Sequence, residues 1–259
     1  MMTTEEIIKE IPKGTFLIVH ASFKPCKAEG LTPEKVIRLL MEQLGEEGTL
    51  MMPTFSYNYT GIWGKKPYDA ATTPGVENGI LSETFRKTPG VLRSNNPTYS
   101  VAVWGKYAHH IAFEARDWAG LGHNSSYELA CKKGAKILLL HVRNNRNSML
   151  HYAEVASGIP YNDIQFRECW GHTAITKDGE MVLQEEFPAC SEEFLKFDEP
   201  FVKEGFATPL GDSFLIDAPE MVEYIVNEMN KQPDIMLCRS GSCEPCQLRR
   251  KRLRQKGLI

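Results

Sequence analysis

The sequence predicts an α/β fold, a three-layer α/β/α sandwich with a mostly parallel central sheet. One observation is that short apolar runs, typical of buried strands, alternate along the chain with amphipathic helical patterns. A second is the length of 259 residues, which is ample for one large core. A third is the segment 173–184, whose Asp178-Gly179 pair is typical of a hairpin turn. We therefore expect a β-hairpin excursion from the main sheet.

The first strand–helix–strand unit has clear boundaries. Gly14 opens an apolar run that ends near Phe23, and a helix follows in which Thr32 is the expected N-cap and Pro33 the first helical residue. Gly45 closes this helix, and the next strand stops near Pro53. Residues 56–76 then form a long loop, and loops of this length in a compact domain are often functional.

The rest of the chain continues the alternation. Further strands are expected at 99–105, 136–142 and 212–217. Helical patterns occupy 77–88, 106–115, 125–133, 191–205 and 218–232.

The net charge of −3 conceals an uneven distribution. Residues 249–256 hold six bases and no acid, so the rest of the chain has 24 bases, 33 acids and a net charge of −9. An acidic body would attract a cationic ligand. The same excess also fits a surface that serves only solubility.

Seven cysteines in a chain of this length indicate free thiols in a reduced compartment. The N-terminal segment is acidic before it is apolar, unlike a secretory signal, and no apolar run reaches the length of a membrane span. We therefore expect a cytoplasmic protein that does not insert into a membrane.

The segment NSMLHYAE contains a histidine and a glutamate three residues apart. A helix is expected to begin near Met149, capped by Asn147 or Ser148. His151 and Glu154 then share one face, with Cβ atoms about 5–6 Å apart. The positive end of the helix keeps the imidazole neutral, as a general base must be, and the carboxylate stabilises the imidazolium that forms. The alternative is a solvated or capping pair.

Five sequence blocks occur in one order between about Gly14 and about Glu228. They are VHASF, LGEEGTLMMPTFS, TPGVENGILSETFRKTPGVLRSNNPTYSVAVWG, GAKILLLHVRNNRNSMLHYAE and TPLGDSFLIDAPEMVEYIV. Together they resemble the aminoglycoside 3-N-acetyltransferase family. The resemblance implies acetyl transfer from acetyl-coenzyme A to an amine, with His151 as general base and Glu154 as its acidic partner.

The resemblance also assigns roles around the donor. Ser148 stands at the place of a family threonine whose hydroxyl serves the oxyanion that forms from the thioester. Serines in HASF and TYSVAVWG match positions near the coenzyme arm, although turn and strand-end capping explains them equally well. The expected coenzyme-binding residues are Ser22, Phe23, Lys24, Ser100 and Val101.

The chain departs from the family pattern beside the acceptor. His141 and Arg143 stand where glycines are usual, and Asn145 where an aspartate is common. An arginine beside a polycationic antibiotic would repel it. Aromatic side chains beside acids suit sugars and amines, or they form a loop cluster that packs on its own domain. The expected acceptor-binding residues are Tyr57, Trp63, Asp69 and Asn145.

We treat residues 1–236 as the acetyltransferase-like domain and 237–259 as a separate basic tail. Cys238, Cys243 and Cys246 are spaced as part of a zinc or iron–sulfur site, with Cys190, His172 or a partner chain as the fourth ligand. The alternative is a flexible tail with free thiols. The basic run is typical of a solvated terminal helix, so nucleic acid is not the expected partner.

Three functions remain open from sequence alone. The first is acetyl-coenzyme A-dependent N-acetylation of an aminoglycoside or similar amino sugar, hence antibiotic resistance. The second is N-acylation of a biosynthetic amine. The third is a degenerate acetyltransferase fold that acts as a binding module. The acceptor, the acyl chain length and any homo-oligomeric state are not specified by the sequence.

Overall fold

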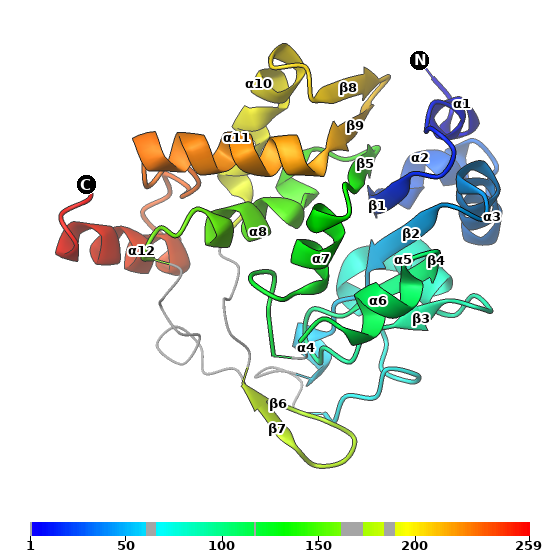
Figure 1. Cartoon of the computed structure of the whole chain (residues 1–259), viewed down its shortest axis with the longest axis horizontal. Helices are drawn as coiled ribbons and strands as arrows, with labels where there is room; N and C mark the ends of the chain where they lie inside the picture. The colour runs from blue at the N-terminus through cyan, green and yellow to red at the C-terminus, as the bar shows by residue number, and fades with distance from the viewer. Residues whose placement is uncertain (1, 61–65, 117, 162–172, 184–189) are drawn as a thin grey trace.

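A seven-stranded sheet forms the centre of the molecule, in the order β3-β4-β2-β1-β5-β9-β8 (Figure 1). The computed structural model describes residues 2–60, 66–116, 118–161, 173–183 and 190–259. The strands are β1 (Phe16–Ala21), β2 (Thr49–Pro53), β3 (Leu92–Arg93), β4 (Val101–Gly105), β5 (Lys136–Leu140), β8 (Ala207–Leu210) and β9 (Ser213–Asp217).

The expectation of a mostly parallel sheet was wrong. Within the described seven-stranded sheet, only the β1–β2 and β1–β5 pairings are parallel, whereas β4 runs against β2 and β9 runs against β5. The edge strands β3 and β8 are also antiparallel to their neighbours. Gly211 and Asp212 join β8 to β9 in a tight turn, in which Gly211 takes a left-handed φ of 66°. An apolar run shows that a strand is buried but not in which direction it points.

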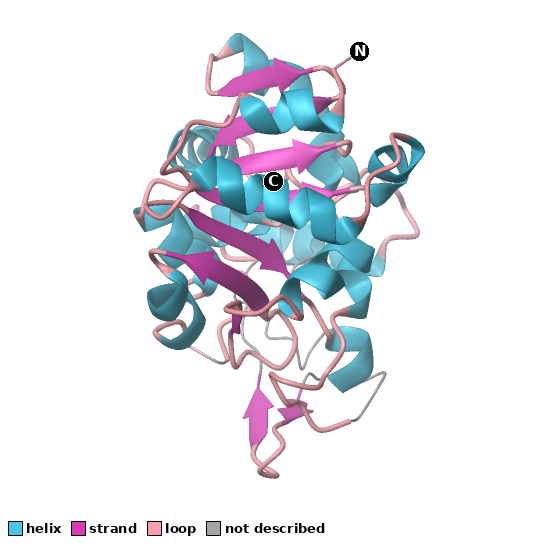
Figure 2. Ribbon diagram, turned by 90° about the vertical axis from the view of Figure 1, so that its right-hand side faces the viewer, coloured by secondary structure: helices cyan, strands magenta, loops and turns pink. Residues whose placement is uncertain are grey.

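Alternate strand residues pack on opposite faces of the sheet. Leu17 and Leu138 belong to a hydrophobic cluster with helices α1 (Thr4–Lys9), α3 (Pro33–Leu44) and α5 (Gly79–Arg86). Ile18 and Ile137 belong to a second cluster on the other face. Figure 2 shows helices flanking the strands. The second cluster includes α6 (Ala108–Phe113), α7 (Ser126–Lys132), α8 (Met149–Ala156), α10 (Asp198–Lys203) and α11 (Ala218–Lys231).

Two predicted elements are confirmed in detail. The helix α3 spans Pro33–Leu44, the Thr32 side chain accepts a hydrogen bond from the Lys35 amide, and Gly45 ends the helix. The predicted hairpin consists of β6 (Thr173–Ile175) paired with β7 (Met181–Leu183). Short helices connect the remaining parts: α2 (Phe23–Ala28), α4 (Tyr57–Thr60), η1 (Val76–Asn78), η2 (Asn144–Arg146) and η3 (Glu192–Phe197).

Near the C-terminus, residues Glu244–Gln255 form helix α12. Its residues Cys246 and Leu253 are buried in the same cluster as α8 and α11. The division of the chain at residue 236 stays a prediction. Among the described helices, none is both long and apolar enough to cross a bilayer.

Candidate active site

A cavity of about 1000 Å³ opens where β1 and β5 end. Because these two strands are parallel and adjacent, their carboxyl ends meet at one edge of the sheet, the usual place for a ligand in such folds. The cavity is lined from β1 by His20, from the loop after it by Ser22, and from the segment after β5 by Ser148 and His151. The fold thus brings residues that are more than a hundred positions apart in sequence to one cavity.

The His151–Glu154 pair is formed within α8. Nδ1 of His151 lies 2.7 Å from Oε2 of Glu154, one helical turn away. The carboxylate is buried, and its other oxygen accepts a hydrogen bond of 3.0 Å from the hydroxyl of Tyr161. A carboxylate only accepts hydrogen bonds, so it keeps the proton of a neutral imidazole on Nδ1. Nε2 then carries the lone pair that a general base needs.

The ring of His151 is held between the helix and a neighbouring aromatic side chain. The ring of Phe194, in η3, lies 4.9 Å from the imidazole, centroid to centroid. The His151 side chain is 11% exposed and lines the cavity. Contacts on two sides fix the orientation of the imidazole, while one part of it faces the cavity.

Of the two expected caps of α8, Asn147 is the one that makes the hydrogen bond. The side-chain oxygen of Asn147 accepts a hydrogen bond of 3.2 Å from the backbone amide of Met149. Ser148 lines the cavity next to His151. Its side chain makes no capping hydrogen bond.

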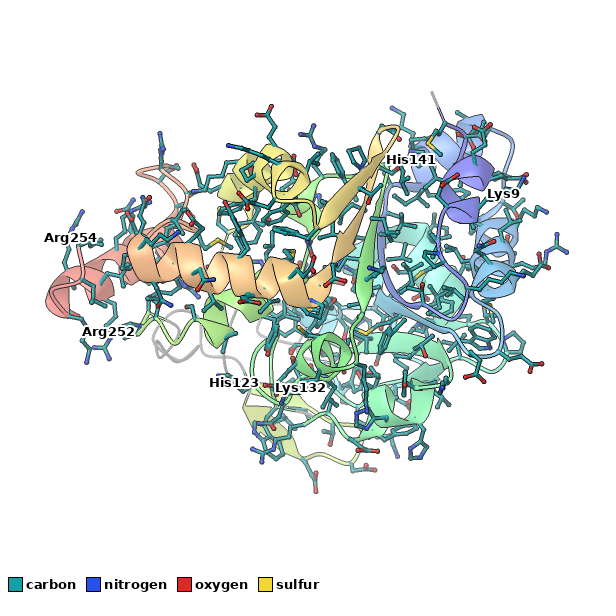
Figure 3. All side chains as sticks on the ribbon, turned by 45° about the horizontal axis from the view of Figure 1, so that its top comes forward. Lys9, His123, Lys132, His141, Arg252 and Arg254 are labelled. Atoms are coloured by element: carbon teal, nitrogen blue, oxygen red, sulfur yellow. The ribbon has the colours of Figure 1, made fainter. Side chains whose placement is uncertain are left out.

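His141 has a left-handed backbone, with φ of 55°. Glycine adopts this region without a steric cost, which explains why a glycine suits the position. The histidine is held by three polar contacts. Its ring nitrogens lie 3.0 Å from the Thr4 hydroxyl and 2.8 Å from the Asp212 carboxylate, and its amide donates to the Ser213 hydroxyl over 2.9 Å. Figure 3 shows His141 at the end of β5, near the N-terminal helices.

Arg143 does not supply the repulsive charge that its sequence position suggested. Its Nε donates to Oδ2 of Asp198 over 2.6 Å, and Asp198 also accepts from the side chain of Asn144 over 2.7 Å. The described cavity-lining residues include its neighbour Arg146 but not Arg143. The guanidinium of Arg143 is thus paired with a buried carboxylate and ties the loop after β5 to α10.

Comparison with known proteins decides the family. The model of the aminoglycoside 3-N-acetyltransferases matches residues 18–230. The aminoglycoside N(3)-acetyltransferase IV of Salmonella is 30% identical over 237 residues, covering 88% of this chain and 85% of the relative. This chain belongs to the aminoglycoside 3-N-acetyltransferase family.

Related proteins and solved structures agree with this assignment. The aminoglycoside N(3)-acetyltransferase III of Pseudomonas aeruginosa is 29% identical over 66% of this chain and 67% of its own. The crystal structure of the acetyltransferase AAC(3)-IVa, as apoenzyme, superposes with a TM-score of 0.78 at 25% identity, covering 96% of this chain and 97% of that chain. A histidine-to-alanine variant of AAC(3)-IVa in complex with a gentamicin gives a TM-score of 0.77 at 25% identity, over 96% of each chain.

Of the expected coenzyme-binding residues Ser22, Phe23 and Lys24, one lines the cavity. Ser22 lines it, at the end of β1. Phe23 packs against the hydrophobic cluster that contains α3, and Lys24 is exposed. The described residues that line the cavity include neither of these two side chains. Of this trio, the placement therefore supports a coenzyme contact for Ser22 alone.

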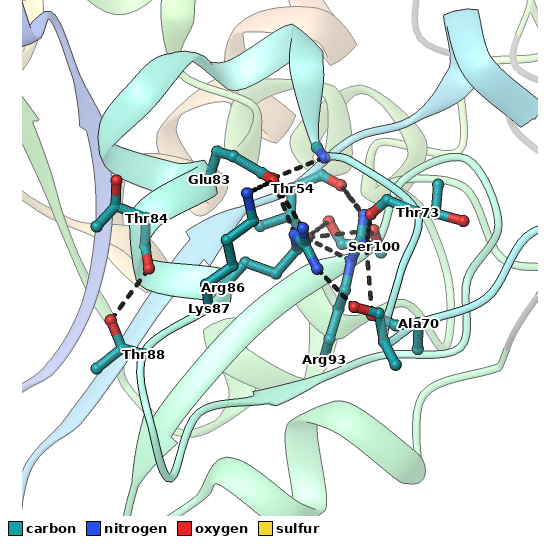
Figure 4. Close-up of polar contacts among 12 residues, drawn as sticks. Thr54, Ala70, Thr73, Glu83, Thr84, Arg86, Lys87, Thr88, Arg93 and Ser100 are labelled. Atoms are coloured by element: carbon teal, nitrogen blue, oxygen red, sulfur yellow. Dashed lines mark hydrogen bonds and ion pairs between the residues drawn. The ribbon is translucent and has the colours of Figure 1, made fainter.

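Ser100 lies in a buried polar network around Arg93, shown in Figure 4. Arg93 is 7% exposed and donates to the backbone oxygens of Thr54 and Thr73. It also donates to the Ser100 hydroxyl over 3.1 Å, and that hydroxyl donates to the Thr54 oxygen over 2.7 Å. Val101, the next residue, is fully buried in the core. This placement does not support a direct coenzyme contact for Ser100 or Val101, and it accounts for the serine structurally.

The expected acceptor-binding residues are separated by the fold. Tyr57 and Asn145 line the cavity, and burial raises the pKa of Tyr57. The Oδ1 of Asp69 accepts a hydrogen bond of 2.7 Å from the amide of Ala71, in a turn, and Asp69 is not among the described lining residues. Trp63 lies outside the described residues.

Three cavity-lining residues, and Tyr161 behind Glu154, escaped sequence reasoning. His20 is buried at 5% exposure, and burial lowers its pKa to about 3, so the imidazole is neutral. Glu77 lines the cavity, and burial raises its pKa. Tyr99 lies beside Tyr57 with 5.8 Å between ring centroids. Tyr161, which donates to Glu154, follows Gly158 and Pro160, and these residues signalled only the end of the helix.

The C-terminal cysteines come together with a fourth. The sulfur atoms of Cys190, Cys238, Cys243 and Cys246 all lie within 4.8 Å of one another. Cys190 was one of three candidates for the fourth position, and His172 lies outside the described residues. Both Cys190 and Cys243 line the same cavity as His151.

Proposed function

We propose that this protein transfers the acetyl group of acetyl-coenzyme A to an amine of an aminoglycoside or similar amino sugar. The observation that carries this proposal is the His151–Glu154 pair, formed at 2.7 Å and facing a cavity of about 1000 Å³. Family membership supports the reaction class. A degenerate binding module would have no need of a buried carboxylate held by two donors.

The reaction needs a base because an ammonium nitrogen has no lone pair. The ammonium first releases one proton to water, and the neutral nitrogen attacks the thioester carbonyl carbon. Nε2 of His151 takes the second proton as the N–C bond forms, and Glu154 stabilises the imidazolium. The C–S bond then breaks, and the departing thiolate takes this proton from the imidazolium. The products are the amide and free coenzyme A.

The oxyanion of the tetrahedral intermediate needs a hydrogen-bond donor. Ser148 lines the cavity one helical turn before His151, so its hydroxyl can serve the oxygen while the imidazole serves the nitrogen. Ser22, at the end of β1, is the donor-side residue that the placement supports. We assign the coenzyme arm to this part of the cavity.

The acceptor side combines aromatic and charged groups. Tyr57 and Glu77 line it, which suits an amino sugar, and the negative charge of −9 outside residues 249–256 favours a cationic acceptor. Arg146 also lines the cavity. An arginine there favours an acceptor with fewer positive charges than an aminoglycoside, so a biosynthetic amine is the second candidate.

The experiment has two parts. Calorimetry should detect acetyl-coenzyme A binding in the micromolar range, and the ligand should raise the melting temperature. Release of thiol from acetyl-coenzyme A should then be followed across a panel of aminoglycosides, monoamino sugars and simple alkylamines. No heat and no thermal shift at millimolar coenzyme would refute the proposal. Activity confined to acceptors with one amine would select the second candidate.

Two finer assignments accompany this function. The cysteine cluster suits a resident zinc ion, and the reduced thiols suit the cytoplasm, where such residues are kept from oxidation.

A further inference from the structure

The four-cysteine cluster joins two segments that are distant in sequence. Cys190 precedes η3, whereas Cys238 and Cys243 flank the turn before α12, and Cys246 lies in its first turn. The sulfurs lie within 4.8 Å of one another, and all four cysteines are free of disulfide bonds. Cys238 and Cys246 are buried, and the other two are partly buried.

The distances between the sulfurs favour a single zinc ion over an iron–sulfur cluster. A tetrahedral zinc ion with Zn–S bonds of about 2.3 Å separates its sulfurs by roughly 3.8 Å, within the span seen here. A four-iron cluster spreads its cysteines over a larger volume, because each sulfur binds a different iron. We propose that Cys190, Cys238, Cys243 and Cys246 bind one zinc ion, which fastens the C-terminal segment as a wall of the catalytic cavity.

Groups around the cluster match a zinc bound by four thiolates. The amide of Glu192 donates to Sγ of Cys190 over 3.5 Å, the kind of contact that stabilises a thiolate. Arg250 donates to the backbone oxygens of Cys238 and Leu237 over 2.7 and 2.9 Å. Its guanidinium thereby lies beside a centre whose net charge would be −2.

The cluster shapes the catalytic cavity directly. Cys190, Ser191, Cys243 and Pro245 line it together with His151. The Ser191 hydroxyl donates to the backbone oxygen of Asn145 over 2.8 Å, on the loop that leads to the catalytic helix. Phe194, four residues after Cys190, is the ring that packs against His151. The segments that zinc would join therefore contain both the residues that line this wall of the cavity and Phe194, the ring that packs against His151.

Helix α12 also contacts a residue next to the His151–Glu154 pair. The guanidinium carbon of Arg249 lies 5.8 Å from the ring centroid of Tyr161, whose hydroxyl binds Glu154. Arg249 is buried at 3% exposure, unlike a residue of a solvated tail. Because four protein ligands close the coordination shell, the zinc has a structural role and takes no step in the reaction.

Metal analysis of the untagged full-length protein tests the site without any assay of activity. Protein purified without chelators should contain about one zinc per chain, and Cys246→Ser and Cys190→Ser should each lower this content at least about tenfold. Cys131→Ser is the matched control, because Cys131 is a free, half-buried cysteine of α7 outside the cluster. Zinc content that stays unchanged in both cluster variants, or that is near zero in the native protein, would overturn the proposal.

Cobalt gives a second readout that does not depend on a variant folding. Replacing the native metal of the unmutated chain with Co²⁺ should produce the intense absorption of tetrahedral cobalt bound by thiolates. Only weak octahedral bands would contradict the site. Thiol titration of denatured protein, with and without reductant, should give the same number of thiols, whereas a gain of four on reduction would mean two disulfides instead of a metal.

Hydrogen exchange tests the role of the metal in the cavity wall. Chelation should raise amide exchange in 190–197 and in 238–255 together, and zinc should restore the protection. Unchanged exchange in either segment would show that zinc does not fasten the wall. The consequence for acceptor binding rests on the proposed function: chelation should raise the KM for the amine several-fold and leave coenzyme affinity unchanged. If no acceptor is found, the metal and exchange results still decide the zinc site.

Discussion

The hydroxyl of Tyr161 lies 3.0 Å from one oxygen of Glu154, and the other oxygen of this carboxylate faces His151. Glu154 is 3% exposed, so it is held between two donors and away from water. Because the Glu154 carboxylate is buried and both of its oxygens have partners, it keeps a fixed orientation relative to the imidazole. This relationship makes the roles of the three side chains separable by substitution.

Replacing His151 tests the general base. His151→Ala should lower turnover by about 10²–10⁴-fold, the usual contribution of such a group, while coenzyme binding survives. Steady-state kinetics on an accepted amine measures the turnover, and calorimetry with acetyl-coenzyme A measures the coenzyme binding. Wild-type turnover in the variant would show that the pair is only a helix-surface contact.

Replacing the carboxylate by an amide should cost less. In Glu154→Gln the amide oxygen can still accept from Nδ1 of His151, and the Tyr161 hydroxyl can rotate to accept from the amide nitrogen. The geometry survives, but the charge that stabilises the imidazolium is lost. We expect a fall in turnover smaller than that of His151→Ala, with unchanged thermal stability. A loss equal to that of His151→Ala would assign the main catalytic effect to the carboxylate charge.

Tyr161 is a positioning residue in this arrangement. Tyr161→Phe keeps the ring beneath Arg249 and removes one donor to a buried carboxylate, which costs about 1–3 kcal/mol of stability. Turnover should fall less than in Glu154→Gln, because the carboxylate keeps its charge and its contact with His151 but loses a donor that fixes its position. The KM for the amine should stay unchanged, because Tyr161 acts through Glu154. Steady-state kinetics separates the two constants, and wild-type turnover at reduced stability would restrict Tyr161 to a packing role.

Substitutions at Ser100 and Ser22 should affect different properties. We expect an effect on the free energy of unfolding at Ser100 and on coenzyme binding at Ser22. Ser100→Ala removes one donor and one acceptor from the network around Arg93, so we expect a loss of about 1–2 kcal/mol in urea unfolding and unchanged coenzyme affinity. Ser22→Ala should weaken coenzyme binding and leave stability nearly unchanged, because Ser22 lines the cavity. Weaker coenzyme binding in Ser100→Ala at unchanged stability would restore the role that the family resemblance gave it.

His20 should make the protein sensitive to mild acid. Burial lowers its pKa to about 3, against 6.5 in the unfolded chain, so between these values the unfolded state binds more protons. Stability attributable to His20 is therefore lost as pH falls below the unfolded pKa, by up to roughly 1.4 kcal/mol per pH unit. Denaturant unfolding between pH 7 and 4 should show a shallower decline for His20→Gln. The control His109→Gln, at an exposed histidine, should decline as the wild type does, and an equal slope in all three proteins would contradict the assignment.

The features that sequence reasoning predicted correctly are local ones. Thr32 and Gly45 delimit α3 through contacts within a few residues. The His151–Glu154 contact spans a single helical turn, so helical spacing alone was enough to place the two side chains together. Such features depend on neighbours in the chain and therefore appear in its pattern.

The features that were missed depend on distant contacts. The direction of β4 and β9 is set by where their connections cross the sheet, which apolar runs do not encode. The strand β8 contains Pro209, which argues against a strand in sequence but is tolerated at an edge. The burial of Ser100 required knowing that Arg93 lies beside it. Cys190 could be offered only as one of several partners for the three C-terminal cysteines, because nothing nearby in sequence points to it.

The ring of His141 touches Thr4 on one side and Asp212 on the other, so the loop bearing the catalytic helix is anchored to the start of the chain and to the far edge of the sheet. A glycine at this position would leave the loop without either anchor. Here the amino terminus belongs to the architecture of the active site, although it lies outside the residues matched by the family model. Removing the first ten residues would accordingly take away the Thr4 hydroxyl that holds the His141 ring, and with it one of the contacts that fix the loop after β5.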